Sequence, residues 1–579
     1  MSIKSSYPSV RPTLDLNFAA TKQLDNRITF ARNTNAYYYT GDTIKTAQNN
    51  LRYSSEINST NWSLFRNTLS TGFYDPFGTQ TAIKLTGDGG TGTSTGAYRT
   101  TIGHDSANGN YTLSVYAKAD QSSYVYVGTN NGNTKAGHFN LSNGTVINNP
   151  GAGGTSNIVD VGGGWYRISI TIDANSHSPD NFFIFGLSGA TGGENRTYTT
   201  SESAFFFGPQ WEIGDSATVY TPTAAETSVV YEPELSYVVN DAPRFDHDPD
   251  TGESLGLLIE ESRTNYMNRS SNFVSNNNPW NALGTWHRVD NLAIAPDGTQ
   301  TADFLRHTSG NILRASFNSG DASGAVWKTF SVWLKGANGG ETFTMDIGDR
   351  GATSFTLTNR WKRYFISTNE AGNGDFIDFS TPGNCFYAWG AQIEANKIPT
   401  SYIPTDGASA TRLYDNAYIT GAANFDTWFN PAEGTIVGEA DRGSDGTEGA
   451  GIGAFRRATG SYHNMIQFAE LYDSNTGYIG RTYYQGGANN TTALISGNSS
   501  GAGIFNKYAY AYKENDFNGA HNGTASTTDT AGKVPTLIDR FIFGGYNDDR
   551  SSQNLDGHIK YLTYYPQRLS NDQLESLTS

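Results

Sequence analysis

Residues 78–82 read Gly-Thr-Gln-Thr-Ala, and the same five letters return as residues 298–302. Four further blocks recur, in the same order in both halves of the chain. They are 114–118 and 331–335 (Ser-Val-aromatic-x-Lys), 165–167 and 361–363 (Trp-x-Arg), 208–212 and 390–394 (Gly-x-Gln-x-Glu), and 220–223 and 402–405 (Tyr-x-Pro-Thr). A repeat this long, with several strand-like blocks, exceeds any solenoid unit. The sequence therefore predicts two copies of one whole domain, in which Trp165 corresponds to Trp361 and Gln210 to Gln392.

The block at 114–118 alternates apolar and polar residues, and so does its copy. Because successive side chains of a strand point to opposite faces, this alternation is typical of a half-buried strand in a β-sandwich. The residues predicted to face the core are Leu113, Val115 and Ala117 in the first copy, and Phe330, Val332 and Leu334 in the second. Tyr116 and Trp333 then belong to the outer face.

The composition also favours an all-β protein. The 579 residues include 65 Gly, 34 Tyr and 31 Phe, and only 16% are charged, against roughly 25% in average soluble domains. Glycine suits turns, and aromatic residues suit strands. We therefore expect a multidomain β-sandwich protein with minimal helix, made of two duplicated jelly rolls and a third sandwich.

Charge, cysteine content and hydropathy exclude several kinds of partner and of stabilising bond. The net charge is −16 without a run of Lys or Arg, so a nucleic-acid partner is not expected. The single cysteine, Cys385, cannot form an internal disulfide. Residues 1–8 lack the apolar core of a signal peptide, and no apolar run is long enough to cross a bilayer. We expect a chain that is made in a cytoplasm and does not insert into a membrane.

The C-terminus carries a helix signal. Residues 557–565 alternate like a strand, and Pro566 stops them. Ser570 followed by Gln573 has the spacing of a capping box, and Leu569 and Leu574 flank it as a hydrophobic staple. The sequence predicts a short terminal helix after Ser570.

Several segments carry a family resemblance. Four of them resemble segments that recur in structural proteins of tailed bacteriophages: 14–18, 27–32, 243–249 (Pro-Arg-Phe-Asp-His-Asp-Pro) and 251–265. The repeated modules resemble the carbohydrate-binding-like jelly rolls of those proteins. The C-terminal region, through residues 434–436 and 568–570, resembles concanavalin A-like (laminin-G-like) sandwiches.

The resemblance implies a virion appendage, first of all a tail fibre or related adsorption protein. Such a protein would be a homotrimer that attaches to other virion proteins of the tail or capsid by its N-terminal region. It would contact bacterial surface polysaccharide from the outside of the particle. Two alternatives stay open: a capsid-decorating or head-fibre structural protein, and a polysaccharide depolymerase.

One departure from the family pattern sets the domain plan. The N-terminal block of the family runs almost directly into the segment at 243–249, whereas here the first jelly roll lies between them. A domain can be inserted where its two ends lie close together. We therefore expect a discontinuous N-terminal attachment platform of residues 1–49 and 232–262. The first jelly roll, residues 50–231, is inserted into it. The second jelly roll (263–412) and the third sandwich (413–579) follow.

Alternating carboxylates at Asp246, Asp248 and Asp250 suggest a Ca²⁺ loop, because such oxygens can converge on a hard cation. The glycine at 252 sits one place late for an EF-hand, and Leu257 occupies the twelfth position, where that loop has Glu. An acidic turn before a strand is the alternative. We expect no cofactor and keep these three residues as the candidate for Ca²⁺.

Glycan sites combine an aromatic face with amides and carboxylates, because C–H-rich sugar faces stack on rings while hydroxyls need polar partners. An ordinary solvent face or surface loop is the alternative for each candidate. The candidates are the predicted loop of Tyr546, Asn547, Asp548, Asp549 and Arg550, and the two outer-face rings, Tyr116 and Trp333.

No pattern singles out a catalytic site. A glycosidase needs two carboxylates that flank a cleft, one of them with a raised pKa. Glu212 and Glu394 are equivalent in the two copies, and this recurrence favours a structural role, such as bonding the backbone of a turn. We predict a protein that is not an enzyme.

Overall fold

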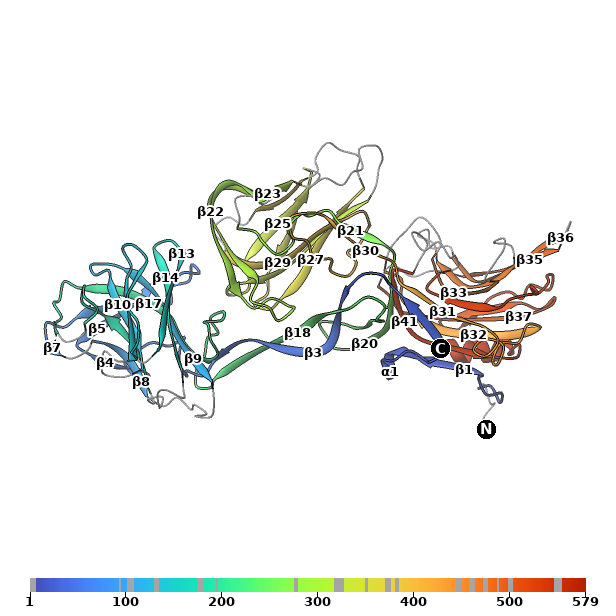
Figure 1. Ribbon diagram of the computed structural model, residues 1–579, viewed down its shortest axis with the longest axis horizontal. Helices are drawn as coiled ribbons and strands as arrows, with labels where there is room; N and C mark the ends of the chain where they lie inside the picture. The colour runs from blue at the N-terminus through green and yellow to red at the C-terminus, as the bar shows by residue number, and fades with distance from the viewer. Residues whose placement is uncertain are drawn as a thin grey trace.

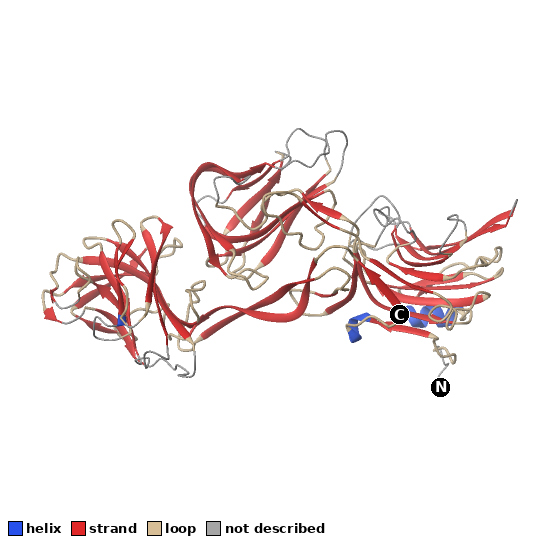
Figure 2. Ribbon diagram, in the orientation of Figure 1, coloured by secondary structure: helices blue, strands red, loops and turns tan. Residues whose placement is uncertain are grey.

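The computed structural model describes residues 7–579, apart from 93–94, 101–108, 130–134, 152, 174–181, 194–195, 275–279, 317–326, 349–351, 370–375, 381–384, 444–449, 458–463, 472–476, 487–488, 498–502 and 546–554. Strands dominate these residues, and the two helices are short: α1 (Phe18–Thr21) and α2 (Asn571–Thr578) (Figure 2). The chain is an all-β, multidomain sandwich protein, as composition and alternation predicted. Neither helix of the described residues has the length and apolar character needed to cross a membrane.

The molecule has three lobes, and both termini lie in the lobe opposite the first module (Figure 1). A long two-stranded antiparallel ribbon of β3 (Ala36–Asn49) and β18 (Ser228–Val238) leads out to the first module. At its tip Asn49 pairs with Ser228, so the chain leaves and re-enters the ribbon at one point. The first module is thus inserted into the chain with its two ends adjacent.

The first module is a sandwich of two six-stranded sheets. One sheet has the order β12 (Thr145–Asn148), β11 (Ala136–Asn140), β10 (Tyr124–Gly128), β15 (Phe182–Leu187), β8 (Gly96–Thr100), β4 (Ser63–Phe65). The other has the order β13 (Thr155–Gly162), β14 (Trp165–Asp173), β9 (Asn110–Ala119), β17 (Ser203–Ile213), β6 (Ala82–Gly87), β5 (Asn67–Phe73), and a small pair joins β7 (Thr91–Gly92) to β16 (Arg196–Thr197). Leu113, Val115 and Ala117 face the core, as predicted.

The second module is built around one long strand, β23 (Ala302–Ser316), whose two halves pair with different strands. The strand order is β26 (Thr353–Thr356), β25 (Thr342–Ile347), β28 (Phe376–Ser380), β23, β29 (Cys385–Glu394), β24 (Lys328–Gly336), β27 (Lys362–Thr368), with β22 (Trp280–Ala293) also on β23 and a separate pair of β21 (Arg263–Asn265) with β30 (Ala410–Arg412). Phe330, Val332 and Leu334 lie in its core, as predicted.

The third domain is a sandwich of an eight-stranded and a seven-stranded sheet. The first has the order β19 (Phe245–His247), β20 (Ser254–Ile259), β41 (Gly557–Tyr565), β32 (Glu433–Ala440), β37 (Asn506–Lys513), β38 (Asn518–His521), β39 (Thr524–Ala525), with β1 (Leu14–Asn17) also on β41. The second has the order β2 (Ile28–Ala31), β31 (Asn416–Thr420), β40 (Arg540–Phe543), β33 (Ala450–Arg456), β34 (Met465–Leu471), β35 (Gly477–Gly486), β36 (Asn489–Gly497).

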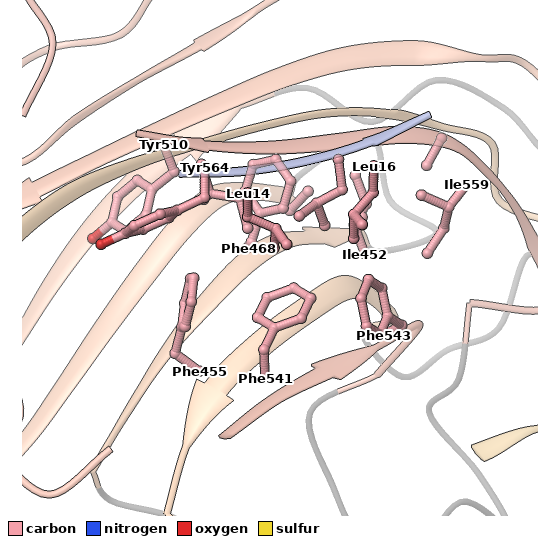
Figure 3. Close-up of a cluster of buried hydrophobic side chains, with 14 of the residues drawn as sticks. Leu14, Leu16, Ile452, Phe455, Phe468, Tyr510, Phe541, Phe543, Ile559 and Tyr564 are labelled. Carbon is pink, nitrogen blue, oxygen red and sulfur yellow. The ribbon is translucent and has the colours of Figure 1, made fainter. Parts of the chain in front are cut away.

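The expected N-terminal platform is not separate from the third domain. Its two segments do contact each other, since the rings of Phe18 and Phe245 lie 6.5 Å apart. However, both segments also add strands to the sheets of the third domain, and Leu14 and Leu16 lie in its core beside Tyr564 (Figure 3). The physical reason is that β1 and β20 cover the edge of β41, which would otherwise expose unpaired backbone groups. The first and last parts of the chain therefore form one folded unit.

The predicted terminal helix is present as α2. The Ser570 side chain accepts a hydrogen bond from the backbone N–H of Gln573, and the Gln573 side chain accepts one from the backbone N–H of Ser570. Leu569 and Leu574 are buried in one small cluster, as a hydrophobic staple requires. The capping box predicted from the sequence is therefore confirmed.

Candidate functional site

The recurring Gly-x-Gln-x-Glu blocks hold equivalent turns in the two modules. Glu212 accepts a hydrogen bond from the backbone N–H of Thr218 at 2.7 Å, and Glu394 accepts one from Thr400 at 2.8 Å. Burial raises the pKa of both carboxyls, while Arg167 and Arg363 oppose that shift. Their structural role, predicted from recurrence, is confirmed.

The glutamines two residues before these glutamates also occupy equivalent positions in the two modules. Gln210 lies opposite Ser114 on β9, and Gln392 lies opposite Ser331 on β24. Each glutamine carbonyl accepts a backbone N–H 2.8 Å away, from Thr221 in one module and from Ile403 in the other. The two modules therefore share this arrangement bond by bond.

Sequence reasoning missed a third duplicated pair, Asn49 and Asn265. The Asn265 side chain donates to the carbonyls of Ala391 and Ile403 and accepts from the backbone of Met267. Asn49 makes the corresponding bonds in the first module. The signal was available, because these asparagines precede the recurring serines, Ser54 and Ser270, by the same number of residues.

Tyr116 and Trp333 are not exposed platforms, and the expectation that they contact glycans is wrong. Each side chain is 1% exposed. Tyr116 lies in a cluster that joins the two modules, together with Tyr387 of the second module. The indole N–H of Trp333 donates to the Tyr39 hydroxyl of the ribbon at 2.9 Å. The physical reason is that the outer sheet faces are covered by neighbouring parts of the chain.

The remaining glycan candidates, Tyr546, Asn547, Asp548, Asp549 and Arg550, lie outside the described residues. They stay a sequence prediction.

The three candidate Ca²⁺ ligands have separate partners. One oxygen of Asp246 accepts the backbone N–H of Tyr39 at 2.7 Å, and Asp248 accepts the N–H groups of its own turn. Asp250 lies 3.9 Å from Lys362. Among the described residues no three His, Cys, Asp or Glu side chains are grouped as metal ligands. Asp248 therefore forms an acidic turn before a strand, which was the alternative interpretation of this segment.

Asp246 also forms part of a largely buried clamp around His558. The two imidazole nitrogens lie 3.1 Å from Asp246 and 3.0 Å from Asp441. Burial by itself lowers the pKa of His558, but the Asp441 charge and the bonds to both carboxylates raise it to about 10. A protonated imidazole therefore links β19, β41 and the end of β32.

A fully buried ionic cluster lies where the ribbon, the second module and the third domain meet. Asp415 pairs with Arg32 at 2.9 Å and with Arg244 at 2.5 Å. Arg244 also pairs with Glu260 at 2.6 Å, and Arg412 lies 3.5 Å from that carboxylate. Breaking such a cluster would leave an uncompensated charge in a low-dielectric interior, so its role is structural.

The best candidate for a ligand site is a cavity of about 600 Å³ between the ribbon, the β19–β20 turn and the second module, which we name the ribbon cavity. Ligand sites occur preferentially at such junctions. Its walls include a half-exposed Tyr231 ring, at 52% exposure, and the Trp361 ring, whose N–H is fixed to the carbonyl of Ile294. Exposed polar side chains surround the rings: Asp42, Asp250, Asn359, Arg360 and Lys362.

Two buried polar side chains also line the ribbon cavity. His247 is 2% exposed; its Nδ1 lies 3.1 Å from the carbonyl of Tyr39, and its Nε2 has no hydrogen-bond partner among the described residues. Glu232 pairs with Lys335 at 3.2 Å, and burial raises the pKa of this carboxyl. The two rings and the exposed polar groups around them are suited to a polyhydroxylated ligand.

Comparisons with known proteins found no matching protein family and no matching curated protein. Solved structures gave partial likenesses. The CBM40 of the Ruminococcus gnavus IT-sialidase, bound to α2,6-sialyllactose, is 17% identical, with 27% of this chain and 88% of that chain covered and a TM-score of 0.24. A leech intramolecular trans-sialidase is 17% identical over 27% of this chain and 24% of that chain, with a TM-score of 0.23.

Proposed function

We propose that this protein binds carbohydrate without cleaving it, as an appendage on the surface of a tailed-phage particle. The observation that carries the binding proposal is the ribbon cavity, where Tyr231 and Trp361 lie among exposed carboxylate, amide and cationic side chains. Such a site stacks a ring on the apolar face of a sugar and supplies partners for its hydroxyls.

The appendage proposal rests on the resemblance of residues 14–18 and 243–249 to structural proteins of tailed phages. The N-terminal strands β1 and β2 belong to the third domain, so attachment through the N-terminal region would place this end of the molecule at the particle (Figure 1). The two duplicated modules would then project toward bacterial surface polysaccharide. Assembly as a homotrimer would multiply individually weak sites through avidity.

The test is a binding screen with the full-length protein immobilised. The probes are purified O-antigen and capsular polysaccharides from a panel of bacterial strains, with dextran and alginate as defined polymers. We expect retention of at least one polymer and no release of reducing ends during prolonged incubation. Failure to retain any of them contradicts carbohydrate binding, whereas release of oligosaccharide identifies a depolymerase instead. Labelling the protein on intact particles then assigns it to the tail or the head.

A further inference from the structure

A second cavity of about 420 Å³ lies beside the first, between the two modules and the ribbon, and we name it the module cavity. The two cavities share lining residues, Asn359 and Arg360. Strand β18 runs along both: Ser228, Val229 and Val230 line the module cavity, and Tyr231 and the next two residues line the ribbon cavity. At the rise of a strand, this shared edge is about 17 Å long.

Arg360 lies at the crossing between the two cavities. It donates a hydrogen bond to the carbonyl of Tyr231 at 2.6 Å, and its guanidinium is 3.8 Å from Glu232. The Arg360 side chain is nevertheless 59% exposed. A guanidinium has five N–H donors, more than these contacts use.

The module cavity carries its own groups for a sugar. Thr79 and Thr81 come from the first module; their hydroxyls donate to the Asp75 carboxylate and keep acceptor lone pairs for a ligand. The exposed side chain of Asn338 comes from the second module. The apolar side chains of Val229 and Val230 come from the ribbon. Polar and apolar side chains therefore line the site on both sides of Arg360, in the ribbon cavity and in the module cavity.

From this continuity we infer that the ligand is a polysaccharide chain, bound through several consecutive sugar units that extend from the ribbon cavity across Arg360 into the module cavity. The inference rests on the proposed function and adds the length of the bound segment and the second half of its site. It also assigns a role to the inserted first module, which supplies one wall of the far half of the site.

The experiment measures affinity against chain length by titration calorimetry. The probes are oligosaccharides of two, four, six and eight sugar units cut from whichever polymer of the screen is retained. We expect the hexasaccharide to bind at least about tenfold more tightly than the disaccharide. The variant Asn338→Trp, which fills the module cavity from an exposed position, should abolish this gain and leave disaccharide binding unchanged.

A matched control is Asn143→Trp, an exposed asparagine of the first module that lines neither cavity. It should keep the wild-type dependence on length. Unchanged disaccharide binding by Asn338→Trp also shows that this variant is folded. An affinity that does not depend on length, or a gain that survives Asn338→Trp, overturns the inference while carbohydrate binding stands. Absence of binding to any polymer or oligosaccharide overturns both.

Discussion

Leu16, in the first strand of the chain, lies directly opposite Leu562, in the last long strand. Both side chains are buried in the core of the third domain. Residues near the two ends of the chain therefore complete one sandwich, and the two modules are carried between them. This arrangement makes the stability of the third domain depend on the N-terminal segment.

Truncation of Leu16 should destabilise the third domain. Leu16 is 4% exposed, and Leu16→Ala removes buried methyl groups and leaves a cavity, which typically costs about 2–5 kcal/mol. The matched control Leu537→Ala, at a position 67% exposed, should stay within about 0.5 kcal/mol of the wild type. Urea unfolding followed by tryptophan fluorescence measures both; equal stabilities for the two variants would contradict the shared core.

A fragment of residues 413–579 should not fold alone. It lacks β1, β2 and β20, so the buried faces that meet Leu14, Ile28 and Leu257 would be open to water. We expect no cooperative thermal transition and strong binding of a hydrophobic dye. A sharp transition in the isolated fragment would show that the N-terminal strands are dispensable.

The sequence predicted local structure well because local structure depends on periodicity. The alternation around Val115 and Val332 identified core faces, and the recurrence of Glu212 and Glu394 identified a structural role. Alternation shows which residues share a face but not what covers that face, so Tyr116 was misplaced. The ribbon cavity could not be predicted, because Tyr231, Asp250 and Trp361 meet only through the docking of separate elements.

Loss of Asp415 should be far more costly than loss of a surface acid. Asp415→Ala leaves the fully buried Arg32 and Arg244 without this partner, and breaking a buried pair costs about 3–5 kcal/mol. Asp25→Ala removes a partly exposed pair with Arg27, which is worth about 0–1 kcal/mol. Calorimetric melting of both variants is the measurement, and a similar small effect for the two would contradict a structural role for the cluster.

Stability should fall as the pH rises from about 6.5 to about 10. In this window the folded protein keeps the His558 proton, because the pKa of His558 is raised to about 10, whereas the unfolded chain has lost it. Folding therefore takes up a proton, and raising the pH opposes folding. Below about pH 6.5 both states are protonated and this contribution is constant. Urea unfolding at several pH values should show the slope in the wild type and a smaller one in His558→Gln; equal slopes would contradict the clamp.

Titration of a retained polysaccharide into Tyr231→Ala tests whether the ribbon cavity binds carbohydrate. Tyr231 is 52% exposed, so removal of its ring should leave the fold intact. The control Tyr74→Ala removes a ring that is 66% exposed and lines neither cavity. We predict that Tyr231→Ala binds at least about tenfold more weakly, equivalent to ~1.4 kcal/mol, while Tyr74→Ala binds like the wild type. Wild-type affinity in Tyr231→Ala would contradict the assignment of this cavity as the sugar site.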